Sequence, residues 1–356
     1  MSAACALGIR QPLLDNELAQ FLRDCDPWAL ILFRPACESP AQVRRLTGDL
    51  RDALGRDAVI WIDQEGGRVA RLTAPNWPIF PPAAAFGQIY AADPLAGLEA
   101  VRLSHRAMAH ELKSIGVDGD FAPVLDLPVP GADPIIGDRA FAAHPEAIIA
   151  LARAAMEALA EGGVVGCIKH IPGHGRADAD SHLALPIVRA TRAELELDFA
   201  PFRALADAPA AMTAHVVYEA LDPDRCATLS AAIIHGLIRE DFGFDGLLMS
   251  DDLDMRALAA SPIKGLGGAN AMPSGQWPLR ERAQAAFDAG CDIVLQCNGI
   301  LADMIETAKA CPALSGKALA RAQAVEAIAQ RGDVWDQAGA LARIARLLSK
   351  FAGAQV

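Results

Sequence analysis

Residues 164–175 read VVGCIKHIPGHG, an apolar run that ends in Lys169 and His170 and then enters a loop. A short run that is apolar without interruption is typical of a strand buried on both faces, as in a parallel sheet. Pro172 and Gly173 argue against a helix directly after it. This stretch therefore predicts a buried parallel strand with polar groups at its C-terminal end.

Seven further runs of the same kind lie along the chain. They are found at 3–9, 28–33, 58–63, 117–125, 210–217, 246–250 and 291–297. Helical patterns separate them: apolar residues recur with a period near 3.6 over 94–115. Thr191 with Glu194 resembles a capping box, and Ser230 resembles an N-cap. A helix after each strand returns the chain so that the next strand can run parallel.

Eight strands with intervening helices predict the α/β class and a single domain over residues 1–356. We expect a (β/α)8 barrel of the TIM type over about 1–315, with a C-terminal helical extension over about 317–350. An open doubly wound sheet is the alternative. The segment of about 261–278 is rich in Gly and Pro and predicts a loop inserted after the seventh strand.

Composition excludes several classes of protein. The 356 residues are 53% hydrophobic and 21% charged, which allows a large core and excludes bulk disorder. The net charge of −12 makes nucleic acid or an anionic membrane a poor partner. The sequence contains no uninterrupted run of about 18 apolar residues, so we expect no membrane span. The N-terminus lacks the features of a secretory signal, and the eight cysteines show no CxxC pair, so we expect reduced thiols and a cytoplasmic protein.

The predicted strands share polar C-terminal ends. These residues are Asp63, Asp126, Lys169 with His170, His215, Asp251 with Asp252, and Asn298. In a parallel barrel such ends surround one mouth, where barrel active sites lie. The sequence therefore predicts an active-site cup and favours the barrel over the open sheet.

A second polar group follows the fifth strand. Asp180 and His182 are two residues apart and can face each other where the backbone turns. A carboxylate beside an imidazole raises the imidazole pKa and selects its tautomer, which makes a proton-transfer dyad. The alternative is a loop whose histidines only hold it together. We expect that structural role for His174 rather than for His182.

Other candidates carry charge at strand ends. Asp251 directly follows a buried run. A carboxylate at such a position can be a nucleophile, a general base or a metal ligand. It can equally be an N-cap or one partner of an ion pair. Spacing does not choose between Asp251 and Asp252. Asp63, Arg71 and Arg139 resemble substrate-binding groups, because carboxylates accept from hydroxyls and guanidinium groups donate in a planar fork. Structural ion pairs would explain them equally well.

Taken together, these segments resemble the bacterial β-N-acetylhexosaminidases of glycoside hydrolase family 3, of the type that acts in peptidoglycan recycling. The matching blocks occur in the family's order: IDQEGGRVARL (62–72), FAPVLDL (121–127), IGDRAF (136–141), KHIPGHG (169–175) with DSH (180–182), MTAHVVY (212–218), SDDLDM (250–255) and AGCDIVLQCN (289–298). Ile171 stands where the family usually has Phe. The resemblance implies a TIM-type barrel, a retaining mechanism, and neither a metal ion nor an organic cofactor.

The resemblance also assigns roles. Asp251 corresponds to the nucleophile, and His182 to the general acid/base held by Asp180. The substrate-binding positions carry over to Asp63, Arg71, Arg139, Lys169 and His170. The implied partner is a small carbohydrate, an N-acetylglucosaminide or muropeptide fragment, with no nucleic acid and no membrane. The oligomeric state stays open.

The expected activity is therefore that of a retaining exo-β-N-acetylglucosaminidase, which removes terminal β-linked N-acetylglucosamine from muropeptides or related glycosides through a glycosyl-Asp intermediate. A β-glucosidase or a glycoside phosphorylase of the same family is the nearest alternative. A metal-dependent amidohydrolase barrel is more remote, with ligands drawn from His170, His174, His182, His215 and Asp251. A barrel that binds without turnover is a further alternative.

Overall fold

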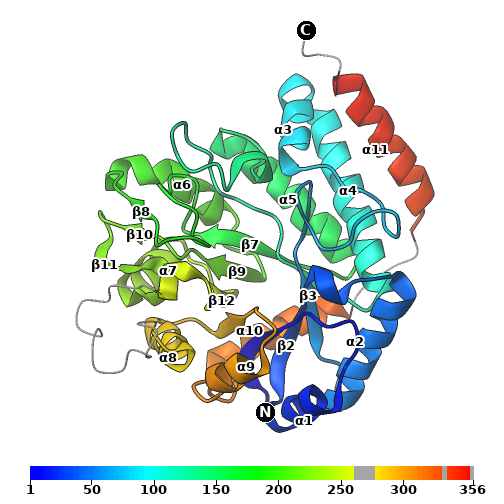
Figure 1. Ribbon diagram of the computed structural model, residues 1–356. Coiled ribbons are helices and arrows are strands. Elements are labelled where there is room, and N and C mark those ends of the chain that lie inside the picture. Colours follow the sequence, from blue (N-terminus) through cyan, green and yellow to red (C-terminus); the bar gives the residue numbers. More distant parts are fainter. Residues whose placement is uncertain (260–276, 331–334, 353–356) are drawn as a thin grey trace.

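Eight parallel strands close into a barrel in the computed structural model, which describes residues 1–259, 277–330 and 335–352 (Figure 1). The strands follow one another around the barrel in chain order, and the last of them, β13, pairs with the first, β1. They are β1 (Ala3–Ile9), β2 (Pro27–Leu32), β3 (Val59–Ile62), β6 (Gly119–Asp120), β7 (Val165–Ile171), β9 (Ala210–Thr213), β12 (Leu247–Asp252) and β13 (Ile293–Gln296). The predicted barrel is confirmed, and each of its strands overlaps one of the eight apolar runs.

Helices surround the barrel. They are α1 (Asn16–Cys25), α2 (Pro40–Leu54), α3 (Ala83–Ala92), α4 (Pro94–Ser114), α5 (Pro145–Glu161), α6 (Arg192–Ala204), α7 (Arg256–Ala259), α8 (Leu279–Ala289), α9 (Leu301–Ala308), α10 (Gly316–Ala329), α11 (Gln337–Ala352) and a π-helix at Ala232–Asp241. The capping box of Thr191 and Glu194 is present at the start of α6. The Ser230 hydroxyl accepts from the Ile233 N–H at the start of the π-helix. None of the described helices is long and apolar enough to cross a membrane.

Two small sheets decorate the carboxyl-terminal side of the barrel strands. A hairpin joins β4 (Gln64–Gly66) and β5 (Val69–Ala70) directly after β3. A three-stranded sheet contains β8 (Ile187–Val188), β10 (Val217–Tyr218) and β11 (Asp222–Cys226). The apolar runs do not predict these sheets, because β5, β8 and β10 have only two residues each and β4 and β11 are mainly polar.

The core has an inner and an outer layer. Inside the barrel, Trp61 stacks on Phe121 with ring centroids 5.0 Å apart, next to Trp28. Gly119 lies against this stack: a Cβ there would come within 2.3 Å of the Trp61 ring. Glycine at position 119 therefore leaves room for the Trp61 ring inside the barrel. The outer layer packs the helices against the outside of the strands.

The two C-terminal helices pack against different parts of the barrel. Ala322 and Val325 of α10 join the inner core at the amino-terminal ends of the strands, where the Trp28 indole N–H donates to Glu326 at 2.9 Å. Helix α11 lies beside α3 and α4, as Figure 1 shows. Helix α10 thus closes one end of the barrel and leaves the other end open. The predicted inserted loop, about 261–278, lies mostly outside the described residues.

Candidate active site

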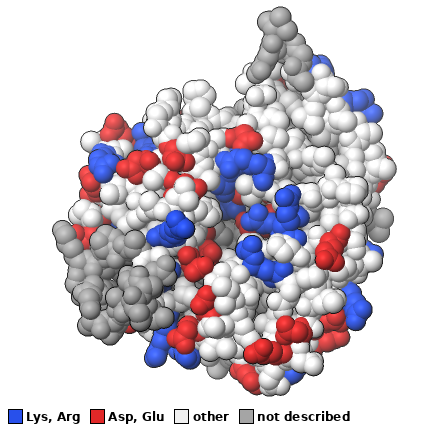
Figure 2. All heavy atoms as spheres, in the orientation of Figure 1, with Lys and Arg blue, Asp and Glu red and all other residues white. Residues whose placement is uncertain are grey.

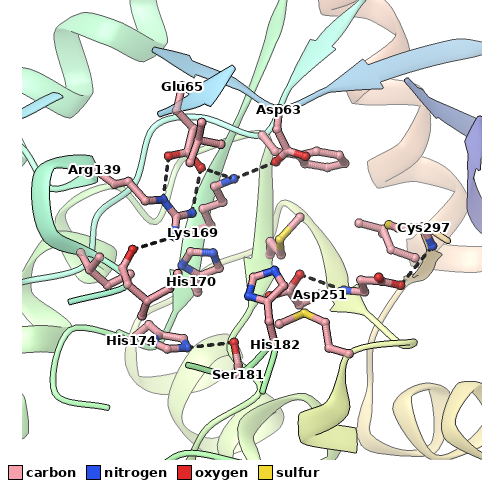
Figure 3. A pocket seen from close by; sticks show the side chains of 18 of the residues that line it. Asp63, Glu65, Arg139, Lys169, His170, His174, Ser181, His182, Asp251 and Cys297 are labelled. Atoms are coloured by element: carbon pink, nitrogen blue, oxygen red, sulfur yellow. Dashed lines mark hydrogen bonds and ion pairs between the residues drawn. The ribbon is translucent and has the colours of Figure 1, made fainter. Parts of the chain in front are cut away.

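A cavity of about 290 Å³ opens at the carboxyl-terminal ends of the barrel strands. Figure 2 shows Lys and Arg side chains gathered around a hollow at the centre of one face, with acidic groups close by. The residues that line the cavity include Asp63, Glu65, Arg71, Arg139, Lys169, His170, His182, Asp251 and Asp252 (Figure 3). The cavity therefore lies at the mouth that the sequence predicts.

Five charged side chains form an alternating chain along one wall. Arg71 donates to Asp63 at 2.8 Å, and Lys169 donates to the other oxygen of Asp63 at 3.0 Å. Lys169 also contacts Glu65 at 2.7 Å. Arg139 donates to both oxygens of Glu65, each at 2.8 Å. Charge thus alternates from Arg71 to Arg139, and Lys169 in the middle joins the two carboxylates.

These groups stay charged because they neutralise one another. Burial by itself would raise the pKa values of Asp63 and Glu65, but Lys169 and the flanking arginines outweigh it. The pKa of Asp63 falls well below its usual range, and that of Glu65 falls to about 2. Burial would lower the pKa of Lys169, but the two carboxylates raise it. The wall therefore presents fixed donors and acceptors at neutral pH.

The turn after β3 holds Arg71 in place at the end of this row of alternating charges. The Gln64 side-chain oxygen accepts from the backbone N–H groups of Arg71 and Leu72, at 3.0 and 2.9 Å. Gly66 has φ +91°, and a Cβ there would lie 2.3 Å from the Pro81 carbonyl oxygen. Glycine is required at this position by both its conformation and its contact. The segment that reads DQEGG is thus a tight turn that aims Asp63, Glu65 and Arg71 at one wall.

Asp126 anchors the neighbouring loop. It is fully buried and accepts from the His170 imidazole Nδ1–H at 2.7 Å and from the His174 backbone N–H at 2.6 Å. Burial opposes ionisation, but the two histidines lower the pKa of Asp126 to about 2. An ionised Asp126 therefore fixes the His170 ring at the cavity wall.

The predicted dyad is present at the rim. The His182 Nδ1–H and backbone N–H both donate to the same oxygen of Asp180, each at 2.8 Å. The His182 side chain is 64% exposed. Burial by itself would raise the pKa of Asp180, but its hydrogen bonds from His182 lower it. Because Nδ1 is held by a carboxylate, Nε2 is the nitrogen left for proton exchange.

Two contacts attach the dyad loop to the barrel. The His174 ring Nε2 lies 3.2 Å from the Ser181 hydroxyl, and the Ser181 carbonyl accepts from the Ala257 N–H at 3.1 Å. Burial lowers the pKa of His174 to about 4, so this ring is neutral. His174 is thus part of the loop support, as the sequence predicts.

The neighbouring carboxylates Asp251 and Asp252 differ in surroundings. One Asp252 oxygen accepts from the Cys297 and Asp254 N–H groups, at 3.0 and 3.1 Å, which turns it toward β13. Burial and the charge of Asp251 raise the pKa of Asp252 to about 7. Burial would also raise the pKa of Asp251, but nearby His215 and His170 lower it. Of these two neighbours, Asp251 is therefore the one that is more fully ionised at neutral pH.

Seven of the eight residues to which the family resemblance assigns roles line the cavity. They are Asp63, Arg71, Arg139, Lys169, His170, His182 and Asp251. Asp180 lies behind His182 as its hydrogen-bond partner. Glu65 was missed, although it stands in the same DQEGG turn, because nothing in the spacing tells it from a surface carboxylate.

The residues of the alternative metal set do not form a ligand group. His215 is fully buried, with Nδ1 bonded to Thr228 and Nε2 to the Asp252 carbonyl. His170 and His174 are engaged with Asp126 and Ser181. Within residues 1–259, 277–330 and 335–352, no three His, Cys, Asp or Glu side chains are grouped to hold a metal ion.

Comparison with known proteins adds the family context. Residues 10–331 match the glycosyl hydrolase family 3 N-terminal domain. A β-hexosaminidase from Alkalilimnicola ehrlichii is 40% identical over 300 residues, which cover 82% of this chain and 80% of that protein. The crystal structure of native NagZ from Neisseria gonorrhoeae matches with a TM-score of 0.82 and 34% identity, over 98% of both chains. NagZ from the same organism in complex with N-trifluoroacetyl-D-glucosamine matches with a TM-score of 0.81, also at 34% identity and over 98% of both chains.

Proposed function

This chain belongs to glycosyl hydrolase family 3, and from that membership we propose that it is a retaining β-N-acetylhexosaminidase that releases terminal β-linked N-acetylglucosamine. The name β-hexosaminidase of the Alkalilimnicola relative supports the reaction. The N-acylated glucosamine bound by the gonococcal NagZ supports the sugar. A small cavity at a single barrel mouth suits one terminal sugar ring, which favours exo action.

The observation that carries the proposal is the ionised Asp251 in the cavity that His182 borders. In the first step, a carboxylate oxygen of Asp251 forms a bond to the anomeric carbon. The bond from that carbon to the leaving oxygen breaks, and this oxygen takes a proton from His182 Nε2. The product is a glycosyl ester of Asp251.

The second step reverses the proton movement. His182 Nε2 takes a proton from water, whose oxygen attacks the anomeric carbon and releases the Asp251 carboxylate. Two inversions give net retention. Retaining enzymes generally use a second carboxylic acid for this proton transfer. Here Asp180 supports the imidazole, because an ionised carboxylate stabilises the imidazolium form.

We propose that the row of charged side chains along the cavity wall forms hydrogen bonds with the sugar hydroxyls. Asp63 would accept from hydroxyl groups, while Lys169, His170, Arg71 and Arg139 would donate. Glu65 would act on the sugar through Arg139 and Lys169, which donate to both its oxygens, because its side chain is only 6% exposed, against 15% for Asp63. Fixed donors and acceptors lose little entropy when substrate binds, so this wall suits tight positioning.

A direct test uses the 4-nitrophenyl β-glycosides of N-acetylglucosamine and glucose, in buffer with a chelator, with and without phosphate. We expect release from the N-acetylglucosaminide, retention of configuration in the sugar by NMR, and loss of activity in Asp251→Asn. A preference for the glucoside would favour the β-glucosidase. A glycosyl phosphate product would favour the phosphorylase. Loss of activity with chelator alone would contradict the proposal.

We further propose that the natural substrate is a muropeptide fragment and that the protein acts in the cytoplasm. All eight cysteines are unpaired, which is typical of a reducing compartment. Cell fractionation with detection of the native chain tests the location. Sugar release from purified peptidoglycan fragments, compared with release from chitobiose, tests the substrate.

A further inference from the structure

Three thiols meet on the outside of the barrel, away from the cavity. Cys5 lies on β1, Cys25 is the last residue of α1, and Cys311 follows α9. We refer to these residues as the thiol trio. The thiol of Cys5 interacts with the thiols of Cys25 and Cys311, and the Cys311 thiol also donates to the Thr307 carbonyl at 3.3 Å.

Backbone hydrogen bonds fix the three segments against one another. The Ala3 N–H donates to the Asp26 carbonyl at 2.8 Å, next to Cys25. The Ala4 N–H donates to the Pro312 carbonyl at 2.9 Å, next to Cys311. Cys5 therefore stands between its two partners because the start of β1 is bonded to both segments. All three side chains belong to the outer core layer.

The thiol trio differs from the other cysteines in its solvent exposure and in the thiols that lie next to it. Cys25 and Cys311 are partly exposed, whereas Cys5 is fully buried. Cys37 is equally half-exposed, but its thiol donates to the Phe33 carbonyl. Cys37 therefore serves as an internal reference for a thiol with similar exposure and no thiol contact in the structure.

The charge distribution within the trio selects one nucleophile. The contacts with Cys25 and Cys311, together with burial, raise the pKa of Cys5 well above its usual value. The hydrogen bond from Cys5 lowers the pKa of Cys25, although burial opposes this. Burial raises the pKa of Cys37 to about 12. The thiolate is the reactive form, and Cys25 combines a lowered pKa with partial exposure, whereas Cys5 is fully buried.

We propose that the thiol trio is an oxidation site for hydroperoxides, at which Cys25 reacts first and a neighbouring thiol of the trio then forms a disulfide with it. The Cys25 thiolate attacks one peroxide oxygen, the O–O bond breaks, and hydroxide leaves with formation of a sulfenic acid. Cys5 or Cys311 then attacks the Cys25 sulfur, and water leaves. Two thiols and one hydrogen peroxide thus give one disulfide and two waters.

The test exposes the folded full-length chain to hydrogen peroxide, followed by unfolding, alkylation of free thiols and peptide mapping by mass spectrometry. We expect the loss of two of the eight thiols, a disulfide-linked peptide within the trio, and recovery with dithiothreitol. Cys37→Ser should behave as the wild type, apart from its own missing thiol. Cys25→Ser should form no disulfide in the trio. Hydrolysis of the nitrophenyl glycoside reports folding, because the cavity lies elsewhere.

Several results would overturn this proposal. One is a folded wild-type chain that keeps all eight thiols while free glutathione in the same tube is oxidised. Another is oxidation of Cys37 as fast as of Cys25. A third is the accumulation of sulfinic acid at Cys25 with no disulfide. If Cys25→Ser does not fold, the peptide map of the wild type alone still distinguishes these outcomes.

Discussion

Asp118 and Asp292 at the amino-terminal end of the barrel and Glu65 at the carboxyl-terminal end are buried carboxylates with different kinds of partner. At the amino-terminal end, Asp118 accepts from Arg51 and Lys113 and also from the Ile60 backbone N–H. Asp292 likewise accepts from two arginines and from the Leu248 backbone N–H. At the carboxyl-terminal end, the donors to Glu65 are the side chains of Arg139 and Lys169. The chemical groups are the same, but their partners differ.

This difference separates support of the fold from support of the site. A carboxylate that bonds to backbone holds a strand to its neighbours and to the helices. A carboxylate that bonds only side chains orients those side chains, and at the mouth they line the cavity. Asp118 and Asp292 thus support the fold and Glu65 supports the site, whereas Asp126 at the mouth does both, since it accepts from the His170 ring and from the His174 backbone N–H. The comparison makes matched pairs of variants possible.

The largest effect should come from Asp251→Asn. Removing the carboxylate nucleophile should lower kcat by about 10³-fold or more, because no other group forms the glycosyl ester. The matched variant is Asp292→Asn, at the amino-terminal end. It should lower the Tm and leave kcat within a few-fold. Kinetics on the nitrophenyl glycoside and thermal unfolding measure both. A fully active Asp251→Asn would break the comparison.

The second effect concerns the rim. His182→Ala should lower kcat by about 10²- to 10⁴-fold, the usual range for general acid/base catalysis. The loss should shrink for a leaving group of low pKa, such as 2,4-dinitrophenol, because that group needs less protonation. The control is Leu183→Ala, since Leu183 is the next residue and is 66% exposed. Equal losses for both leaving groups would argue against His182 as the acid.

The third prediction compares two buried carboxylates that have the same kinds of side-chain partner. Glu65→Gln and Asp118→Asn each remove one charge from between an arginine and a lysine. Each should cost about 2 kcal/mol of stability. Only Glu65→Gln should also lower kcat/KM, by about 10- to 100-fold and mainly through KM, because Arg139 and Lys169 lose their orientation. Glu65→Asp should fail to restore full activity. An equal fall in kcat/KM for Asp118→Asn would show that lost stability explains both.

Sequence patterns predict the barrel and most of the mouth for a physical reason. Strands buried on both faces must be apolar along their length, so the polar residues at their ends, such as Lys169 and Asp251, are conspicuous. The dyad of Asp180 and His182 is visible because its partners are two residues apart. Local signals of this kind survive in a single sequence.

Long-range pairing is not visible in the same way. Glu65 meets Arg139 across 74 residues, and Asp126 meets His170 across 44. The sequence near Glu65 contains no pattern that indicates Arg139 as its partner, and the sequence near Asp126 contains none that indicates His170. The choice between Asp251 and Asp252 has the same origin, since it depends on His215, His170 and the backbone of β13. Short strands such as β8 and β10 carry too few residues to show a period.

The smallest predicted effect is a change in how the stability of the protein depends on pH, and it concerns Asp252 at the mouth of the barrel. The pKa of Asp252 is raised to about 7 in the folded chain, against an ordinary value near 3.8. Between these two values the folded state holds a proton that the unfolded state releases, so stability should fall as the pH rises from about 4 to 7 and level off above 7. One proton can contribute at most about 1.4 kcal/mol per pH unit, and the partial exposure of Asp252 reduces this.

Asp252→Asn should therefore flatten the dependence of Tm on pH over this window and leave kcat within about ten-fold. Its neighbour provides the control. The pKa of Asp251 is lowered, so the stability it contributes is present above its ordinary pKa and is lost only as the pH falls through its lower folded value. Asp251→Asn should lose activity but keep most of the fall in stability, since burial is the main cause of the raised pKa of Asp252; the fall should end at a lower pH, because the charge of Asp251 also raises that pKa. If both variants flatten the slope, the raised pKa belongs to the pair, and the mouth then holds its two carboxylates as one coupled unit.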